Sequence, residues 1–168
     1  MIQTRRRQPS ISGKGICILN IFVCVKQVPA TNKVEVDEKT GVLKRGGVLS
    51  KMNPYDLYAI ETALRLKEEY GAETAALTMG PPYGEAVLRE AMMMGIACIS
   101  TKVAGSTEII QSMDNGILTD IGDRDALTKA MLMLAEDDAL RDKLQKNAAI
   151  TAEQFKTENI IAQWEDLI

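Results

Sequence analysis

The chain has 168 residues, enough for one domain with a real hydrophobic core, and its 46% hydrophobic and 26% charged residues are ordinary for a globular protein. The net charge of −3 gives no electrostatic basis for binding nucleic acid, and no segment reaches the roughly 20 apolar residues that a membrane-spanning helix needs. Histidine is absent, which excludes Ser-His-Asp catalysis and imidazole metal sites. Three widely spaced cysteines without a CxxC motif favour a reducing cytoplasm.

The first 17 residues are polar and basic and show no periodicity, so we expect residues 1–17 to form a disordered leader. A signal peptide is the alternative, because an apolar run follows the arginines. Asn20 interrupts that run and Lys26 ends it, which favours a buried strand over residues 18–26. Beyond it, two short segments are expected to form a hairpin that turns at Gly41.

The clearest helix signal begins at Asn53, a preferred N-cap. Pro54 suits the first helical position, Asp56 can close a capping box, and Gly71 ends the helix. Apolar residues recur at helical spacing, and we expect this half of the helix to pack on a sheet: Leu57, Ala59, Ile60, Ala63, Leu64, Leu66 and Tyr70.

Two further buried strands are expected at residues 74–79 and 96–99, separated by a helix that ends at Gly95. Strands that alternate with helices predict an α/β fold, a Rossmann-like three-layer sandwich with a mainly parallel sheet. The C-terminal third is expected to be mainly helical, with helices starting at Ser106 or Thr107, at Asp123, near Asp137 and at Thr157, and a strand at 117–119 after a turn at Asn115-Gly116.

Ligands of open parallel sheets bind beyond the carboxyl ends of the strands. Three segments are expected to meet there, namely residues 24–29, 53–56 and 79–82. Free amides at the helix start and the glycine loop could receive an anion or a purine edge. The same pattern also fits a plain helix cap and a plain turn, and both readings stay open.

Residues 20–95 resemble the N-terminal part of the electron transfer flavoprotein beta subunit, on the motifs Val23-Cys-Val-Lys-Gln-Val-Pro29, Met52-Asn-Pro-Tyr-Asp56, Glu61-Thr-Ala-Leu-Arg-Leu-Lys67, Thr78-Met-Gly-Pro81 and Arg89-Glu-Ala-Met92. The resemblance implies an adenine-nucleotide alpha-hydrolase-like fold, an electron transfer flavoprotein alpha subunit as partner, and AMP or FAD as ligand. By resemblance, the nucleotide would lie against Cys24, Asn53, Pro54, Tyr55, Asp56 and Met79. The family's phosphate-binding loop does not follow Ile96, so only the adenosine half of that site is implied.

Residues 90–168 resemble the C-terminal part of the donor domain of GT-B retaining glycosyltransferases, on the motifs Gly95-Ile-Ala-Cys-Ile-Ser-Thr101, Ala104-Gly-Ser-Thr-Glu-Ile-Ile110, Asn115-Gly-Ile-Leu118 and Gly122-Asp-Arg-Asp-Ala-Leu127. That family holds a nucleotide sugar such as UDP-glucose with two glutamates spaced E-x7-E. Glu90 matches the second glutamate, whereas the first falls on Pro82. Gly105 and Ser106, at a helix start, would contact phosphate.

The chain is therefore interpreted as a hybrid, with residues 18–95 and 96–168 packed as one domain. Three functions follow from this interpretation. The first is a truncated, non-catalytic module that binds AMP or FAD, and the second is a nucleotide-sugar glycosyltransferase fragment. The third is a folded hybrid with neither activity. No complete general-base or charge-stabilising set is present, so no turnover is expected.

Overall fold

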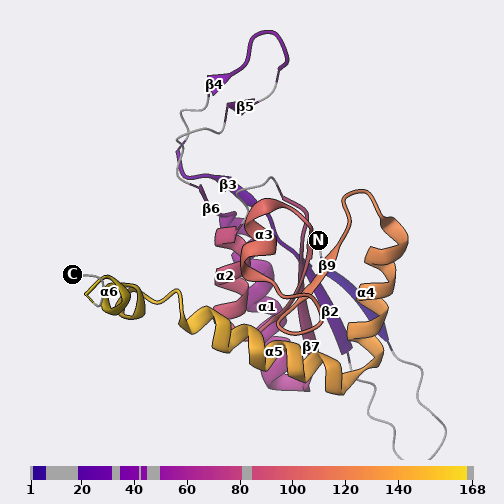
Figure 1. Cartoon of the computed structure of the whole chain (residues 1–168). Helices are drawn as coiled ribbons and strands as arrows, with labels where there is room; N and C mark the ends of the chain where they lie inside the picture. The colour runs from indigo at the N-terminus through magenta and orange to yellow at the C-terminus, as the bar shows by residue number, and fades with distance from the viewer. Residues whose placement is uncertain are drawn as a thin grey trace, which may run out of the picture.

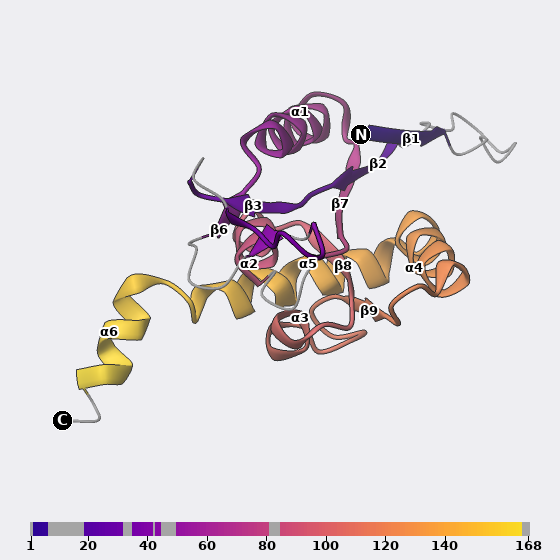
Figure 2. The ribbon, with the colours of Figure 1, turned by 90° about the horizontal axis from the view of Figure 1, so that it is seen from above.

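The computed structural model describes residues 2–6, 19–31, 35–41, 43–44, 50–80 and 85–165. Its centre is a five-stranded sheet (Figure 1). The strands follow the order β1-β2-β7-β8-β9, as the view from above shows (Figure 2). Four of these strands are parallel neighbours, namely β2 (Leu19–Cys24), β7 (Glu73–Thr78), β8 (Ala97–Thr101) and β9 (Ile117–Thr119). The predicted α/β fold with a mainly parallel sheet is confirmed.

Helices cover both faces of the sheet. Each pair of consecutive parallel strands is joined by a crossover that contains one helix. These helices all pack on the same face of the sheet: α1 (Pro54–Tyr70), α2 (Glu85–Met93) and α3 (Ala104–Ile109). On the opposite face lies α4 (Arg124–Glu136), as Figure 2 shows. Because every crossover returns to the next strand on the same side, the strand order does not reverse within the described sheet.

Two further helices complete the chain. α5 (Asp138–Glu153) runs along the amino-terminal edge of the sheet, where its side chains contact the first residues of β7. α6 (Thr157–Glu165) starts at the predicted residue and extends away from the body (Figure 1). None of the helices in the described residues is both long and apolar enough to cross a lipid bilayer.

The apolar core of the described residues forms two clusters, one on each face of the sheet. The first joins Val23 of β2 to Ala148 of α5, and the second joins Leu77 of β7 to Leu144 of α5. Each cluster therefore contains residues from before and after Gly95, the position where the two sequence resemblances meet.

Local signals in the sequence predicted most helix ends correctly. Asn53 adopts an extended conformation ahead of α1, with Pro54 as the first helical residue. Gly71 and Gly95 end α1 and α2 with φ of 65° and 66°, a conformation that glycine adopts without steric cost. The side chain of Asp123 caps α4, and its Oδ1 accepts a hydrogen bond from the backbone amide of Ala126 at 2.8 Å.

The predicted hairpin is also present. β4 (Glu35–Val36) and β5 (Leu43–Lys44) pair antiparallel, and the hairpin projects from the body in Figure 1. Asp37 Oδ1 accepts hydrogen bonds from the amides of Lys39 and Thr40, both at 2.9 Å, and these bonds hold the pKa of this carboxyl below its usual value. Gly41 turns the chain with φ of 67°.

Several expectations differ from the structure. Ile2–Arg6 forms β1, antiparallel to β2, although the leader was expected to lack regular structure; residues 7–18 lie outside the described part. A second pairing that the sequence did not predict joins β3 (Gln27–Pro29) to β6 (Ser50–Met52). Both involve short polar segments, whose pairing depends on partners far away in the sequence rather than on a local pattern.

Three local details also differ. α1 buries a narrower stripe than its hydrophobic pattern predicted, so that Leu57 and Tyr70 are exposed. α3 begins at Ala104, which places Ser106 in the third helical position and not at the cap. The predicted turn is centred on residues 113–115, where Met113 rather than Gly116 has a positive φ.

Candidate functional site

The carboxyl end of β2 meets the start of α1 at the side chain of Asp56. Asp56 Oδ2 accepts a hydrogen bond from the backbone amide of Lys26 at 2.8 Å, and the Lys26 ammonium lies 3.0 Å from Oδ1. The side-chain amide of Asn53 donates to the same Oδ1 at 3.0 Å. The backbone amide of Asn53 in turn donates to the Lys26 carbonyl at 3.0 Å.

This arrangement corrects the predicted role of Asp56. In a capping box, its carboxylate would accept from the backbone amide of Asn53. Here it accepts instead from Lys26 and from the Asn53 side chain, and so ties the helix start to the strand end. Asp56 is buried, and the ordered partners compensate for the loss of water around its charge. The contribution of Lys26 was not predicted, because nothing local to its sequence indicates a partner 30 residues away.

Two sulfur-containing side chains lie at adjacent strand ends beside this network. Cys24 is the last residue of β2, is exposed, and pairs in register with Leu77 of β7. Met79 directly follows β7 and is 65% exposed. The backbone amide of Val25 donates to the Leu77 carbonyl at 2.9 Å, which keeps the two strand ends together. We call Cys24 and Met79, with the α1 start at residues 53–56, the strand-end site.

The residues expected to contact an adenine nucleotide lie at the carboxyl ends of β2 and β7 or at the start of α1: Cys24, Asn53, Pro54, Tyr55, Asp56 and Met79. Tyr55 is 79% exposed in the first turn of α1. The predicted third segment is described only as far as Gly80, so Pro81 and Pro82 lie outside the described residues. The strand order does not reverse at this edge, so the fold itself supplies no switch-point crevice among the described strands.

The residues expected for a nucleotide sugar lie on two other elements, α2 and α3. Glu90 is half-buried on α2. Gly105 and Ser106 are buried in α3, a helix of only six residues. The Ser106 hydroxyl donates to the carbonyl of Thr101 at 2.6 Å and accepts from the amide of Val103 at 3.1 Å. It therefore closes the turn that starts α3.

The described residues contain no cluster of three or more acidic or cysteine side chains suited to a metal ion. Of the two described cysteines, Cys98 is buried in β8, and burial raises the pKa of its thiol to about 12. Because the thiolate is the form that acts as nucleophile and metal ligand, burial disfavours both roles for Cys98.

The strands and crossovers define a Rossmann-like α/β protein with the strand-end site at the carboxyl edge of its sheet. Within it, residues 40–99 match the family model of the electron transfer flavoprotein domain, and residues 84–151 match that of glycosyl transferases group 1. The two matches overlap at residues 84–99, which include α2 and the start of β8. The chain is thus a hybrid of two family resemblances that meet at the predicted place.

Curated relatives support the first resemblance. The chain is 50% identical over 78 residues to the caffeyl-CoA reductase-Etf complex subunit CarD of Acetobacterium woodii, and 49% identical over 77 residues to the electron transfer flavoprotein subunit beta of Clostridium acetobutylicum. It is 46% identical over 77 residues to protein FixA of Azorhizobium caulinodans. Each alignment covers 46% of this chain but only 27–30% of the relative.

Solved structures that resemble the chain include Anabaena Alr3699/HepE in complex with UDP and glucose, at a TM-score of 0.48 and 20% identity, with 67% of this chain and 36% of that chain covered. TarM has a TM-score of 0.43 and 15% identity, with 70% and 33% covered. Likenesses at this level say nothing about what this chain binds.

Proposed function

We propose that the chain is a non-catalytic module that binds an adenine nucleotide, AMP or FAD, at the strand-end site. The observation that supports this most is the meeting of Cys24, Met79 and the α1 start, which are far apart in the sequence, on adjacent strand ends. The electron transfer flavoprotein match at residues 40–99 contains two of these three elements.

The chemistry of the exposed groups suits a purine. Methionine sulfur makes favourable contacts with aromatic rings, of about 0.3–1.5 kcal/mol each. Tyr55 provides an exposed aromatic ring at the same edge. The side-chain amide of Asn53, half-buried between strand and helix, offers hydrogen bonding to a base or ribose.

The proposal extends to a partner and a location. Among the relatives, one is named as a subunit of a caffeyl-CoA reductase-Etf complex and another as an electron transfer flavoprotein subunit beta. An electron transfer flavoprotein alpha subunit is accordingly the proposed partner. The chain spans at most 30% of these relatives, so we propose an incomplete site with weaker binding. A reducing, cytoplasmic location fits an exposed free thiol at Cys24.

A thermal melt with AMP, FAD or UDP-glucose in parallel tests this function. A ligand at a hundred times its dissociation constant should add about 2.7 kcal/mol to the free energy of unfolding. We expect shifts with AMP or FAD, reduced by Met79→Ala. Met93→Ala is the matched control, because Met93 is also exposed but ends α2, on a different element. A shift that both variants retain equally would contradict the assignment to the strand-end site.

The second candidate is a nucleotide-sugar glycosyltransferase fragment, favoured by the match at residues 84–151. It predicts a shift with UDP-glucose that Glu90→Ala abolishes, and it predicts no effect of Met79→Ala. A cooperative melt that none of the three ligands moves would favour the third possibility, a folded hybrid that has lost both activities.

A further inference from the structure

We propose that the strand-end site recognises the uncharged adenosine part of its ligand and gives no net attraction to phosphate, so that a nucleoside binds as well as its nucleotide. This inference rests on the proposed function and specifies its ligand class. It follows from how the charges and amides of the site are already used within the protein.

The amides at the start of α1 are the first place where a phosphate would be expected to bind. Pro54 has no N–H. The amide of Tyr55 donates to the Asn53 side chain at 3.4 Å, and those of Asp56 and Leu57 donate to the Asn53 carbonyl at 2.9 and 3.3 Å. An anion would have to displace these bonds and would gain little from the helix start.

The cation nearest the site is compensated in the same way. The Lys26 ammonium lies 3.0 and 3.3 Å from the two oxygens of Asp56. The Asp56 side chain is only 11% exposed and is held by three donor groups, so it cannot turn away to admit another anion. A phosphate that approaches the Lys26 ammonium also meets the Asp56 carboxylate beside it, and the repulsion from this carboxylate offsets the attraction to the ammonium.

The neighbouring strand end shows the same balance. Lys102 directly follows β8, and its ammonium pairs with Asp120, the residue after β9, at 2.8 Å. A further lysine among the described residues, Lys51, is exposed on β6 near this edge. Whether its charge attracts phosphate is tested below with a Lys51 variant. Within the described residues, both lysines that follow parallel strands at the carboxyl edge thus have their own carboxylate.

Isothermal titration with adenosine and with AMP, at about 50 and 300 mM NaCl, tests the inference. We expect dissociation constants within threefold of each other and insensitive to salt. AMP that binds more than threefold tighter than adenosine would overturn the inference while leaving the proposed function intact. If adenosine and AMP both fail to bind, the proposed function itself is wrong, so the two failures are distinguishable.

Variants test the cause. Asp56→Asn leaves the Lys26 charge uncompensated, so AMP should become more than threefold tighter than adenosine at low salt. The double variant with Lys26→Gln should return the ratio to that of the unchanged chain. An unaltered ratio in Asp56→Asn, with circular dichroism showing a folded protein, would contradict the balance described above. If Asp56→Asn does not fold, the affinities of the unchanged chain for adenosine and AMP decide whether the inference holds.

Lys51→Gln is the remaining control, because it removes an exposed positive charge from the same edge without touching the pair of Lys26 and Asp56. We expect the ratio of AMP to adenosine affinity to stay the same. A selective loss of AMP binding in this variant would assign a phosphate contact to Lys51 and overturn the inference.

Discussion

Cys24 and Cys98 are chemically identical side chains in opposite surroundings, one exposed at a strand end and one buried in β8. We predict that a disulfide reagent labels Cys24 in the folded chain at once, and labels Cys98 only when the protein unfolds. The measurement is spectrophotometric thiol titration in a Cys17→Ser background, because Cys17 lies outside the described residues. Rapid labelling of two thiols in the folded state would contradict the burial of Cys98.

The same thiol links stability to alkaline pH. Burial raises the pKa of Cys98 from 9.0 to about 12. Between these values the unfolded chain loses the proton and the folded chain keeps it, so the free energy of unfolding should fall as pH rises. For one group the slope reaches about 1.4 kcal/mol per pH unit. Urea denaturation at pH 8 to 11 measures this slope. Cys98→Ala should show a shallower decrease, because it removes this thiol and leaves the tyrosines and lysines unchanged.

At the scale of single elements, the start of α1 offers the most direct test. Asn53→Ala removes the acceptor of the Tyr55 amide and the donor to Asp56, and should cost about 1 kcal/mol in free energy of unfolding. Asn53→Ser restores the cap but not the contact with Asp56, and should recover part of that loss. Urea denaturation of the three proteins measures both steps. If Asn53→Ser is as unstable as Asn53→Ala, the cap contributes nothing.

How much could be predicted from the sequence depends on whether the signal is local. The ends of α1 and α4 were predicted, because Asn53, Gly71 and Asp123 act within one helical turn. The antiparallel pairing of β3 with β6 was not, since its segments are short, polar and separated by the hairpin. The gathering of Cys24 and Met79 was predicted from the rule for parallel strands, whereas the contact between Lys26 and Asp56 depends on side-chain packing.

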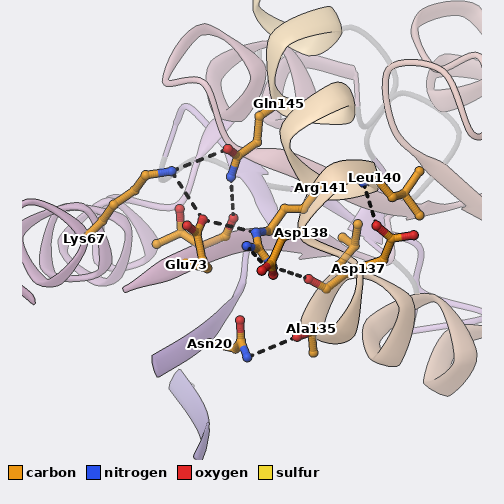
Figure 3. A network of polar contacts seen from close by, with 11 residues as sticks. Asn20, Lys67, Glu73, Ala135, Asp137, Asp138, Leu140, Arg141 and Gln145 are labelled. Atoms are coloured by element: carbon orange, nitrogen blue, oxygen red, sulfur yellow. Dashed lines mark hydrogen bonds and ion pairs between the residues drawn. The ribbon is translucent and has the colours of Figure 1, made fainter. Parts of the chain in front are cut away.

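Arg141 shows the same limit on the scale of the whole molecule. An arginine in a polar helix is expected at the surface, yet its side chain is only 3% exposed. Figure 3 shows why: its guanidinium donates to the carboxylates of Glu73 of β7 at 3.1 Å and Asp138 at 2.9 Å. It also donates to the carbonyl of Leu134 in α4 at 2.8 Å. The network therefore joins the start of β7, in the first half of the chain, to α4 and α5 in the second.

We predict that Arg141→Ala lowers the free energy of unfolding by about 3 kcal/mol, because it leaves Glu73 without its closest cation and opens a buried space. Arg65→Ala is the matched control, since Arg65 pairs with Glu61 on the exposed face of α1, where such a pair contributes about 0.3–0.5 kcal/mol. Urea denaturation measures both. Equal effects of the two substitutions would show that the buried network adds nothing.

The polar network around Arg141 and the two apolar clusters lead to a prediction for the chain as a whole. Gln145 of α5 donates to the Thr74 carbonyl of β7 at 3.2 Å, and Asn20 of β2 donates to the Ala135 carbonyl of α4 at 3.3 Å. Neither half can open without exposing apolar surface of the other, so we propose that residues 18–95 and 96–168 unfold as one cooperative unit despite their different resemblances.

Calorimetry should then give one transition whose van't Hoff and calorimetric enthalpies agree. Native-state hydrogen exchange should assign the same free energy of opening to core amides of β7, before Gly95, and of α5, after it. Arg141→Ala, although it lies in α5, should lower the protection of both elements equally, because its partner Glu73 begins β7. Protection that falls in α5 alone would mean that the two halves fold separately, and the strand-end site would then owe its stability to the first half only.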